Sequence, residues 1–179
     1  MLDVTGPARR TPILPPGAAG LVRALPPADR FVLRMRAFSG DAGGFDLTGP
    51  LNSARGTSAR FAARLGPDEW LLVCPEGDGP AAEAAISAAL AGQVFSLVGV
   101  GHRNAAIAIE GPHASDVLNA GIALDLSEAA FPDGSATRTL LGKAEVVLVR
   151  LSGGFRLECW RSFAPYAHAF LTEVAQEFA

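Results

Sequence analysis

The stretches ARLGPDEWLLVCP (residues 63–75) and VRLSGGFRLECW (residues 149–160) decide the fold, because they share one build. In each, two apolar runs flank a short turn that contains glycine, and this pattern is typical of a β-hairpin. Each is followed by a helical pattern, over 80–91 and over 163–178. A hairpin is marginal alone and needs a helix to cover its apolar face. We therefore predict an α+β fold of pseudo-duplicated β-hairpin/helix units.

The segments around these units carry further strand and helix patterns. FVLRMRAF (31–38) alternates apolar and polar residues, as a half-buried strand does. Other strand patterns lie at 93–98, 104–110, 135–141 and 144–151, and one short helical pattern lies at 112–120. We expect a single α+β domain over 31–179, with two hairpin-helix halves at about 31–98 and 99–179.

Two segments lack such patterns. Residues 1–30 contain six prolines, which fix φ and remove backbone donors, so we predict a proline-rich N-terminal arm with little regular structure. Residues 39–58 are rich in glycine, serine and threonine and have no apolar period. Long loops of this kind are usually functional, bound to a partner or disordered. We interpret residues 39–58 as a candidate contact segment.

Composition excludes several classes of protein. The net charge is −3 and the 15 basic residues are scattered, so we expect no nucleic-acid partner. No apolar stretch approaches the roughly 20 residues of a membrane span, and the N-terminus lacks the apolar run of a signal peptide. We predict a cytoplasmic protein with no membrane segment. Cys74 and Cys159 lie in apolar strand patterns without a partner at redox or metal spacing, so we expect two buried thiols.

The motifs of common active sites are not found in the sequence. His102, His113 and His168 do not have the spacing of a metal site. The glycine-rich loop GVGHRN (99–104) has Asn104 where a dinucleotide loop has its third glycine, and a strand pattern follows it. We therefore expect neither a metal nor a cofactor on this chain.

Asp125, in ALDLSEAAF, is the one weak catalytic candidate. Its carboxylate could bind an N–H-bearing ligand or act as a base. The alternative is an aspartate that only stabilises a turn or caps a helix.

The second hairpin carries the candidate interface residues. Arg156 and Glu158 alternate with apolar residues, which places both on the side away from the core. They could line a subunit contact or a solvated face. Trp160 falls on the same face, beside Arg161, and occupies the place that Trp70 has in the first hairpin. Half-exposed tryptophan and arginine are typical of protein interfaces, although ordinary packing is an equal alternative for Trp160.

Three segments carry a resemblance to a known family: HRNAAIAIEGPHASDVLNAGIALDLSEAAFPDGSATRT (102–139), TRTLLGKAEVVLVR (137–150) and FRLECWRSFAPYAHAFL (155–171). In order and spacing they resemble the gamma subunit of heterotetrameric sarcosine oxidase, and LGPDEWLLV (65–73) fits the same family. The resemblance runs from about residue 60 to the C-terminus.

This resemblance implies a fold similar to the folate-binding domain of the glycine-cleavage aminomethyltransferase. It also implies a complex that oxidises sarcosine to glycine, forms hydrogen peroxide and passes the one-carbon unit to tetrahydrofolate. In the family, FAD, FMN, NAD and tetrahydrofolate belong to partner subunits, and gamma has no assigned catalytic role. Position matching places Asp125 where the aminomethyltransferase has its catalytic aspartate, but this chain lacks the later domains that complete the folate pocket.

The resulting hypothesis is an accessory, non-catalytic subunit that contacts the alpha subunit directly, with beta and delta in the same complex. The arm, residues 39–58 and the exposed sides of the hairpins would form the contact. One alternative is a small stand-alone folate-binding one-carbon protein that uses Asp125. Another is a diverged paralogue that kept the fold and binds something else.

Overall fold

The computed structural model describes residues 21–36 and 38–178, which form ten strands in two antiparallel sheets. The N-terminal sheet, in the order β3-β4-β5-β2-β6, consists of β2 (Ala28–Met35), β3 (Ser53–Gly56), β4 (Phe61–Gly66), β5 (Glu69–Pro75) and β6 (Phe95–Gly99). The C-terminal sheet, in the order β1-β7-β10-β9-β8, consists of β1 (Val22–Ala24), β7 (Asn104–Ile109), β8 (Ala136–Leu141), β9 (Ala144–Leu151) and β10 (Gly154–Trp160).

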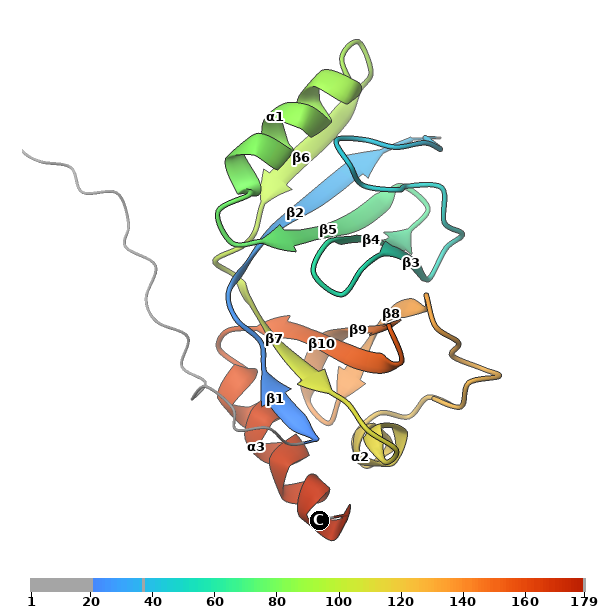
Figure 1. Ribbon diagram of the computed structural model, residues 1–179, viewed down its shortest axis with the longest axis vertical. Helices are drawn as coiled ribbons and strands as arrows, with labels where there is room; N and C mark the ends of the chain where they lie inside the picture. The colour runs from blue at the N-terminus through green and yellow to red at the C-terminus, as the bar shows by residue number, and fades with distance from the viewer. Residues whose placement is uncertain (1–20, 37, 179) are drawn as a thin grey trace, which may run out of the picture.

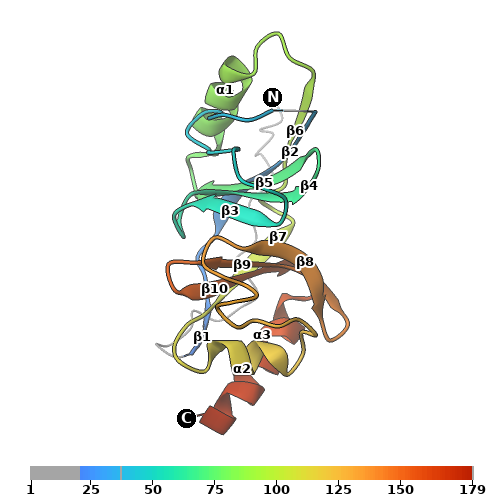
Figure 2. The ribbon, with the colours of Figure 1, turned by 90° about the vertical axis from the view of Figure 1, so that its right-hand side faces the viewer.

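The two sheets lie face to face, with helices on both outer sides (Figures 1 and 2). Helix α1 (Gly79–Ala89) covers the N-terminal sheet. Helices α2 (Ala114–Asn119) and α3 (Ala164–Ala175), the latter continued by the 3-10 turn η1 (Gln176–Phe178), cover the C-terminal sheet. Within the described residues, no helix is both long and apolar enough to cross a bilayer.

The alternation of side chains along each strand produces this four-layer stack. On β2, Phe31, Leu33 and Met35 are buried on the α1 side, as the sequence pattern predicts. The residues between them point to the opposite face. That face lies against the C-terminal sheet and contains a third apolar cluster, built from Ala28, Ala54, Phe61, Ala63, Leu71, Val73, Ala136 and Val149.

The two sheets have equivalent topologies, which confirms the predicted pseudo-duplicated α+β fold. In each, one strand lies beside the last strand of a three-stranded meander: β2 beside β3-β4-β5, and β7 beside β8-β9-β10. A helix follows each meander. In the N-terminal sheet, the edge strand next to β2 is β6, which follows α1 in the chain. In the C-terminal sheet, the edge strand next to β7 is β1, which comes from the N-terminal segment. The N-terminal segment therefore completes the sheet of the other half.

This pairing corrects the prediction for the arm. Residues 1–20 lie outside the described residues. Residues 22–24 form β1, which pairs with β7, and β2 already begins at Ala28. Proline tolerates an extended backbone, so Pro26 and Pro27 only separate the two strands and allow the chain to pass from one sheet to the other.

The predicted turns are confirmed. Pro67 and Asp68 connect β4 to β5. Ser152 and Gly153 connect β9 to β10, and both have positive φ, at 57° and 76°. A two-residue hairpin with positive φ at both positions is the type I′ turn, whose twist matches that of the strands it joins.

Residues 39–58 differ from the prediction of an unstructured loop. Ala42, Phe45 and Leu47 are buried in the cluster beneath α1, and β3 forms at the end of the segment. The sequence shows no regular period here because these three side chains are buried by an irregular backbone. The exposed apolar side chain of this segment is Leu51, at 53%.

Candidate functional site

A buried ion cluster joins the two sheets. Arg30 of β2 donates to both carboxylate oxygens of Glu158 on β10, with Nε–Oε2 at 2.7 Å and Nη2–Oε1 at 3.1 Å. Arg156 donates from Nε to Glu158 Oε1 at 2.8 Å. The side chains of Arg30 and Glu158 are at most 1% exposed, and that of Arg156 is 12% exposed. The cluster of two cations and one anion therefore carries one net positive charge inside the molecule.

The position of this cluster corrects one expectation for the candidate interface. Arg156 and Glu158 do lie on the face away from the helix-covered core, as the alternation predicts. The N-terminal sheet covers that face, so the prediction that both side chains face solvent or a partner is wrong for Glu158. The stacking of one sheet on another is not visible in the local sequence pattern.

A second ion pair also connects the sheets. Glu69 of β5 accepts from Arg34 of β2, with Oε2–Nη2 at 2.6 Å, and from Arg138 of β8. Glu69 is buried, whereas both arginines are about half exposed. The hydrogen bond from Arg138 holds the pKa of Glu69 below its usual range, although burial opposes this effect. Burial also raises the pKa of Glu158, but Arg156 and Arg30 outweigh it, so this pKa is lowered as well.

These lowered pKa values predict a loss of stability in acid. A carboxylate with a depressed pKa in the folded state stabilises the fold fully above its unfolded pKa, about 4.3 for glutamate, and the contribution disappears as pH falls through the folded pKa. We expect the free energy of unfolding to fall below about pH 4.5, and to fall less steeply in a Glu158→Gln variant. Urea titrations over a pH series measure both slopes. If the unfolding free energy of the two proteins changed equally with pH, Glu158 would not contribute to the loss of stability in acid.

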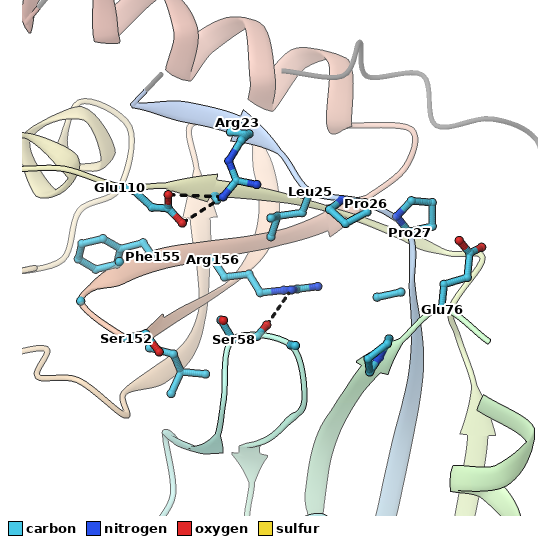
Figure 3. A pocket seen from close by; sticks show the side chains of 17 residues that line it. Arg23, Leu25, Pro26, Pro27, Ser58, Glu76, Glu110, Ser152, Phe155 and Arg156 are labelled. Carbon is cyan, nitrogen blue, oxygen red and sulfur yellow. Dashed lines mark hydrogen bonds and ion pairs between the residues drawn. The ribbon is translucent and has the colours of Figure 1, made fainter. Parts of the chain in front are cut away.

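A pocket of about 880 Å³ opens beside the buried cluster (Figure 3). It lies where the β1–β2 connection meets the β3–β4 turn, the end of β5 and the β9–β10 turn. Leu25, Pro26 and Pro27 form an apolar wall, and Arg23 and Arg156 contribute charge. A volume of this size is within the usual range of small-molecule sites.

The two pocket arginines also contact other groups beside the pocket. Arg23 pairs with Glu110 through Nη2, at 3.2 Å to Oε1. Arg156 donates from Nη1 to the backbone oxygen of Ser58 at 3.2 Å, and its guanidinium lies 5.4 Å from the centre of the Phe61 ring. Arg156 thus connects the buried cluster to the pocket. The local sequence pattern indicates Arg156 but not the pocket, because the walls of the pocket come from segments far apart in the chain.

An exposed aromatic surface lies at the other end of β10, where the chain enters α3. Trp160 is 49% exposed, Phe163 40% and Tyr166 42%. The ring centres of Trp160 and Phe163 are 6.4 Å apart. Arg161 follows Trp160 and is partly buried. The buried face of α3 is formed by Ala164, Ala167 and Leu171, so Phe163 and Tyr166 lie outside that face. We define Trp160, Phe163 and Tyr166 as the aromatic surface.

Asp125 lies in the exposed loop between α2 and β8, outside the lining of the pocket. Its Oδ1 accepts a hydrogen bond from the backbone N–H of Ser127 at 2.9 Å. This bond holds the pKa of Asp125 below its usual range. The carboxylate stabilises a turn, which matches the non-catalytic alternative.

The two cysteines are buried thiols, as predicted. Burial, reinforced by the neighbouring Glu158 carboxylate, raises the pKa of Cys159 to about 12. Within the part of the chain that the structure describes, no three histidine, cysteine or acidic side chains gather as metal ligands would.

Comparison with known proteins relates this chain to a family. The model of the sarcosine oxidase gamma subunit family matches residues 38–177. A sarcosine oxidase subunit gamma from Arthrobacter sp. is 35% identical over 98 residues, which are 55% of this chain and 46% of that protein. The match thus spans less than half the length of this relative.

Two solved structures are similar in fold. A chain of the heterotetrameric sarcosine oxidase from Corynebacterium sp. U-96 superposes with a TM-score of 0.76 at 26% identity, over 88% of this chain and 84% of that chain. The glycine cleavage system aminomethyltransferase T from Bartonella henselae superposes with a TM-score of 0.58 at 14% identity, over 84% of this chain and 44% of that chain. The second likeness shows a shared fold, as the sequence resemblance implies.

Proposed function

The chain belongs to the sarcosine oxidase gamma subunit family, and from this premise we propose that it is an accessory subunit of a heterotetrameric sarcosine oxidase. The observation that carries the proposal is the family match, which extends over most of both sheets and their helices. The likeness in fold to a chain of a heterotetrameric sarcosine oxidase supports it independently.

In this proposal, the whole complex oxidises sarcosine to glycine with formation of hydrogen peroxide and transfers the one-carbon unit to tetrahydrofolate. FAD, FMN, NAD and tetrahydrofolate bind to the partner subunits, and this chain supplies no complete active site. Its direct partner is the alpha subunit, with beta and delta in the same assembly. The complex works in the cytoplasm.

The aromatic surface is the contact that we assign to the alpha subunit. Large aromatic side chains dominate binding energy at protein interfaces, and three of them are about half exposed here on one short segment. Arg161 follows Trp160 in the chain, and we add it to this contact because arginine is likewise enriched at interfaces. Of the predicted interface residues, Trp160 and Arg161 thus remain in the proposal. Glu158 and Arg156 do not, because both belong to the buried cluster inside this chain.

Expression of the larger subunits with and without this chain tests the proposal. We expect the chain to co-purify with them, and the yield of sarcosine-dependent peroxide activity to fall when the chain is left out. Full yield and activity of the alpha and beta subunits in its absence would exclude an accessory role.

The folate-binding alternative makes a different prediction at Asp125. Because the carboxylate is exposed and, among the residues that the structure describes, bonds to its own turn, we expect Asp125→Asn to leave both co-purification and the midpoint of thermal unfolding close to those of the wild type. Titration calorimetry with tetrahydrofolate provides the discriminating measurement. Saturable folate binding that disappears in the Asp125→Asn variant would favour the stand-alone one-carbon protein instead.

A further inference from the structure

The two arginines of the pocket occupy one row of the C-terminal sheet. Arg23 of β1 and Arg156 of β10 are both directly opposite Ala108 of β7, which lies between them. Residues opposite one another in a sheet point to the same face. Neighbouring strands are about 4.8 Å apart, so the two arginine backbones are separated by about 10 Å. Because the side chain of Ala108 is small, the space over this part of the sheet stays open. Arg23, Ala108 and Arg156 all line the pocket.

Both guanidinium groups line this space, and each keeps N–H donors that its neighbours among the described residues do not use. An arginine has five N–H donors. Among the described residues, Arg23 donates only from Nη2, to Glu110. Arg156 donates from Nη1 to Ser58, which leaves the second N–H of that nitrogen, while its Nε bonds to Glu158 and its Nη2 lies 2.7 Å from Oε1 of the same carboxylate. Neither arginine is saturated by its neighbours.

Two arginines and two glutamates, Glu76 and Glu110, line the pocket, so the positive charge that an anion could meet is local to the arginines. Glu110 neutralises Arg23, but Glu158 is shared between Arg30 and Arg156, so the buried cluster keeps one positive charge. Arg156 lines the pocket and Arg30 does not, which directs this charge toward the pocket. A monovalent carboxylate would pair with the local charge of these arginines, and its two oxygens match the planar donor geometry of arginine.

The remaining wall favours an apolar body on the ligand. Leu25, Pro26 and Pro27 contribute carbon surface, and the two proline rings are conformationally fixed. We propose that this pocket binds a small organic acid, with its carboxylate between Arg23 and Arg156 above Ala108 and its apolar body against residues 25–27.

Fluorescence titration of the full chain with 2-naphthoate tests the proposal, with the uncharged 2-naphthamide as the matched probe. We expect saturable 1:1 binding of the acid, and binding of the amide weaker by about tenfold or more, as loss of a charge-assisted hydrogen bond implies. Arg23→Gln removes one guanidinium donor, and Ala108→Leu places a larger side chain in the space between the two arginines. Each should weaken binding of the acid by about tenfold or more. Arg36→Gln is the control, because Arg36 is exposed and lies outside the pocket.

Thermal unfolding of each variant separates lost binding from lost structure. The Arg23 side chain is 35% exposed, so its replacement leaves the fold intact even where Ala108→Leu is poorly tolerated. Absence of saturable 2-naphthoate binding to the wild type, or equal affinity in wild type and Arg23→Gln, would overturn the proposal. The chain is titrated alone, so the result does not depend on whether it joins the oxidase.

Discussion

A Glu158→Gln variant should lose about 3–5 kcal/mol of unfolding free energy, because it leaves two arginines without their anion between the sheets. Arg30 is the more affected, since it is 2% exposed and donates two hydrogen bonds to this carboxylate. For a chain of this length the loss corresponds to a decrease of about 10 °C in the unfolding midpoint. Urea and thermal unfolding at neutral pH measure it.

Glu145→Gln provides the matched control, because Glu145 is exposed on β9 and its replacement should change the unfolding free energy by less than about 0.5 kcal/mol. Replacing the whole cluster with Arg30→Met, Arg156→Met and Glu158→Leu should recover most of the loss, since apolar residues of similar size often substitute for buried ion groups. Equal stability of Glu158→Gln and wild type would contradict the buried geometry of the cluster.

Trp160→Ala should weaken association with the larger oxidase subunits by about 2 kcal/mol or more, which is about a thirtyfold increase in Kd. Tyr166→Ala should act in the same direction, because its ring belongs to the same surface. The fold should tolerate Trp160→Ala at a cost of about 1 kcal/mol, since roughly half of the side chain is already in water. Surface plasmon resonance with immobilised larger subunits measures the affinity.

Val98→Ala is the control for this surface. Val98 is 53% exposed on β6, at the edge of the N-terminal sheet, so its truncation should leave Kd within about twofold. Leu51→Ala tests the rest of the predicted contact, because Leu51 is the exposed apolar side chain of residues 39–58. Loss of affinity in the Val98 or Leu51 variant, with none in the Trp160 variant, would move the interface to the other half of the molecule.

Sequence reasoning predicted the features that depend on neighbouring residues. The turn at Pro67 and Asp68 and the turn at Ser152 and Gly153 are set by local chemistry, and both are confirmed. The helices that follow each hairpin were also predicted from the local pattern, and both are confirmed. The turn role of Asp125 was one of two alternatives, and Asp125 accepts the hydrogen bond from Ser127 that this role requires.

Features that depend on distant segments could not be predicted. Strand β1 has only three residues and no period of its own, and it forms because β7 offers an unpaired edge. Glu158 has the spacing of an exposed strand residue, and only the stacking of the second sheet buries it. The pocket depends on both effects, since β1 supplies Arg23 and the sheet stacking supplies the buried charge.

Native mass spectrometry of this chain mixed with the larger oxidase subunits tests the central claim most directly. The account predicts a complex whose mass exceeds that of the partner assembly by one copy of this 18.5 kDa chain, and whose yield falls when Trp160→Ala replaces the wild type. A mixture in which the chain stays separate from folded partner subunits would contradict the claim that this protein is a subunit of the oxidase.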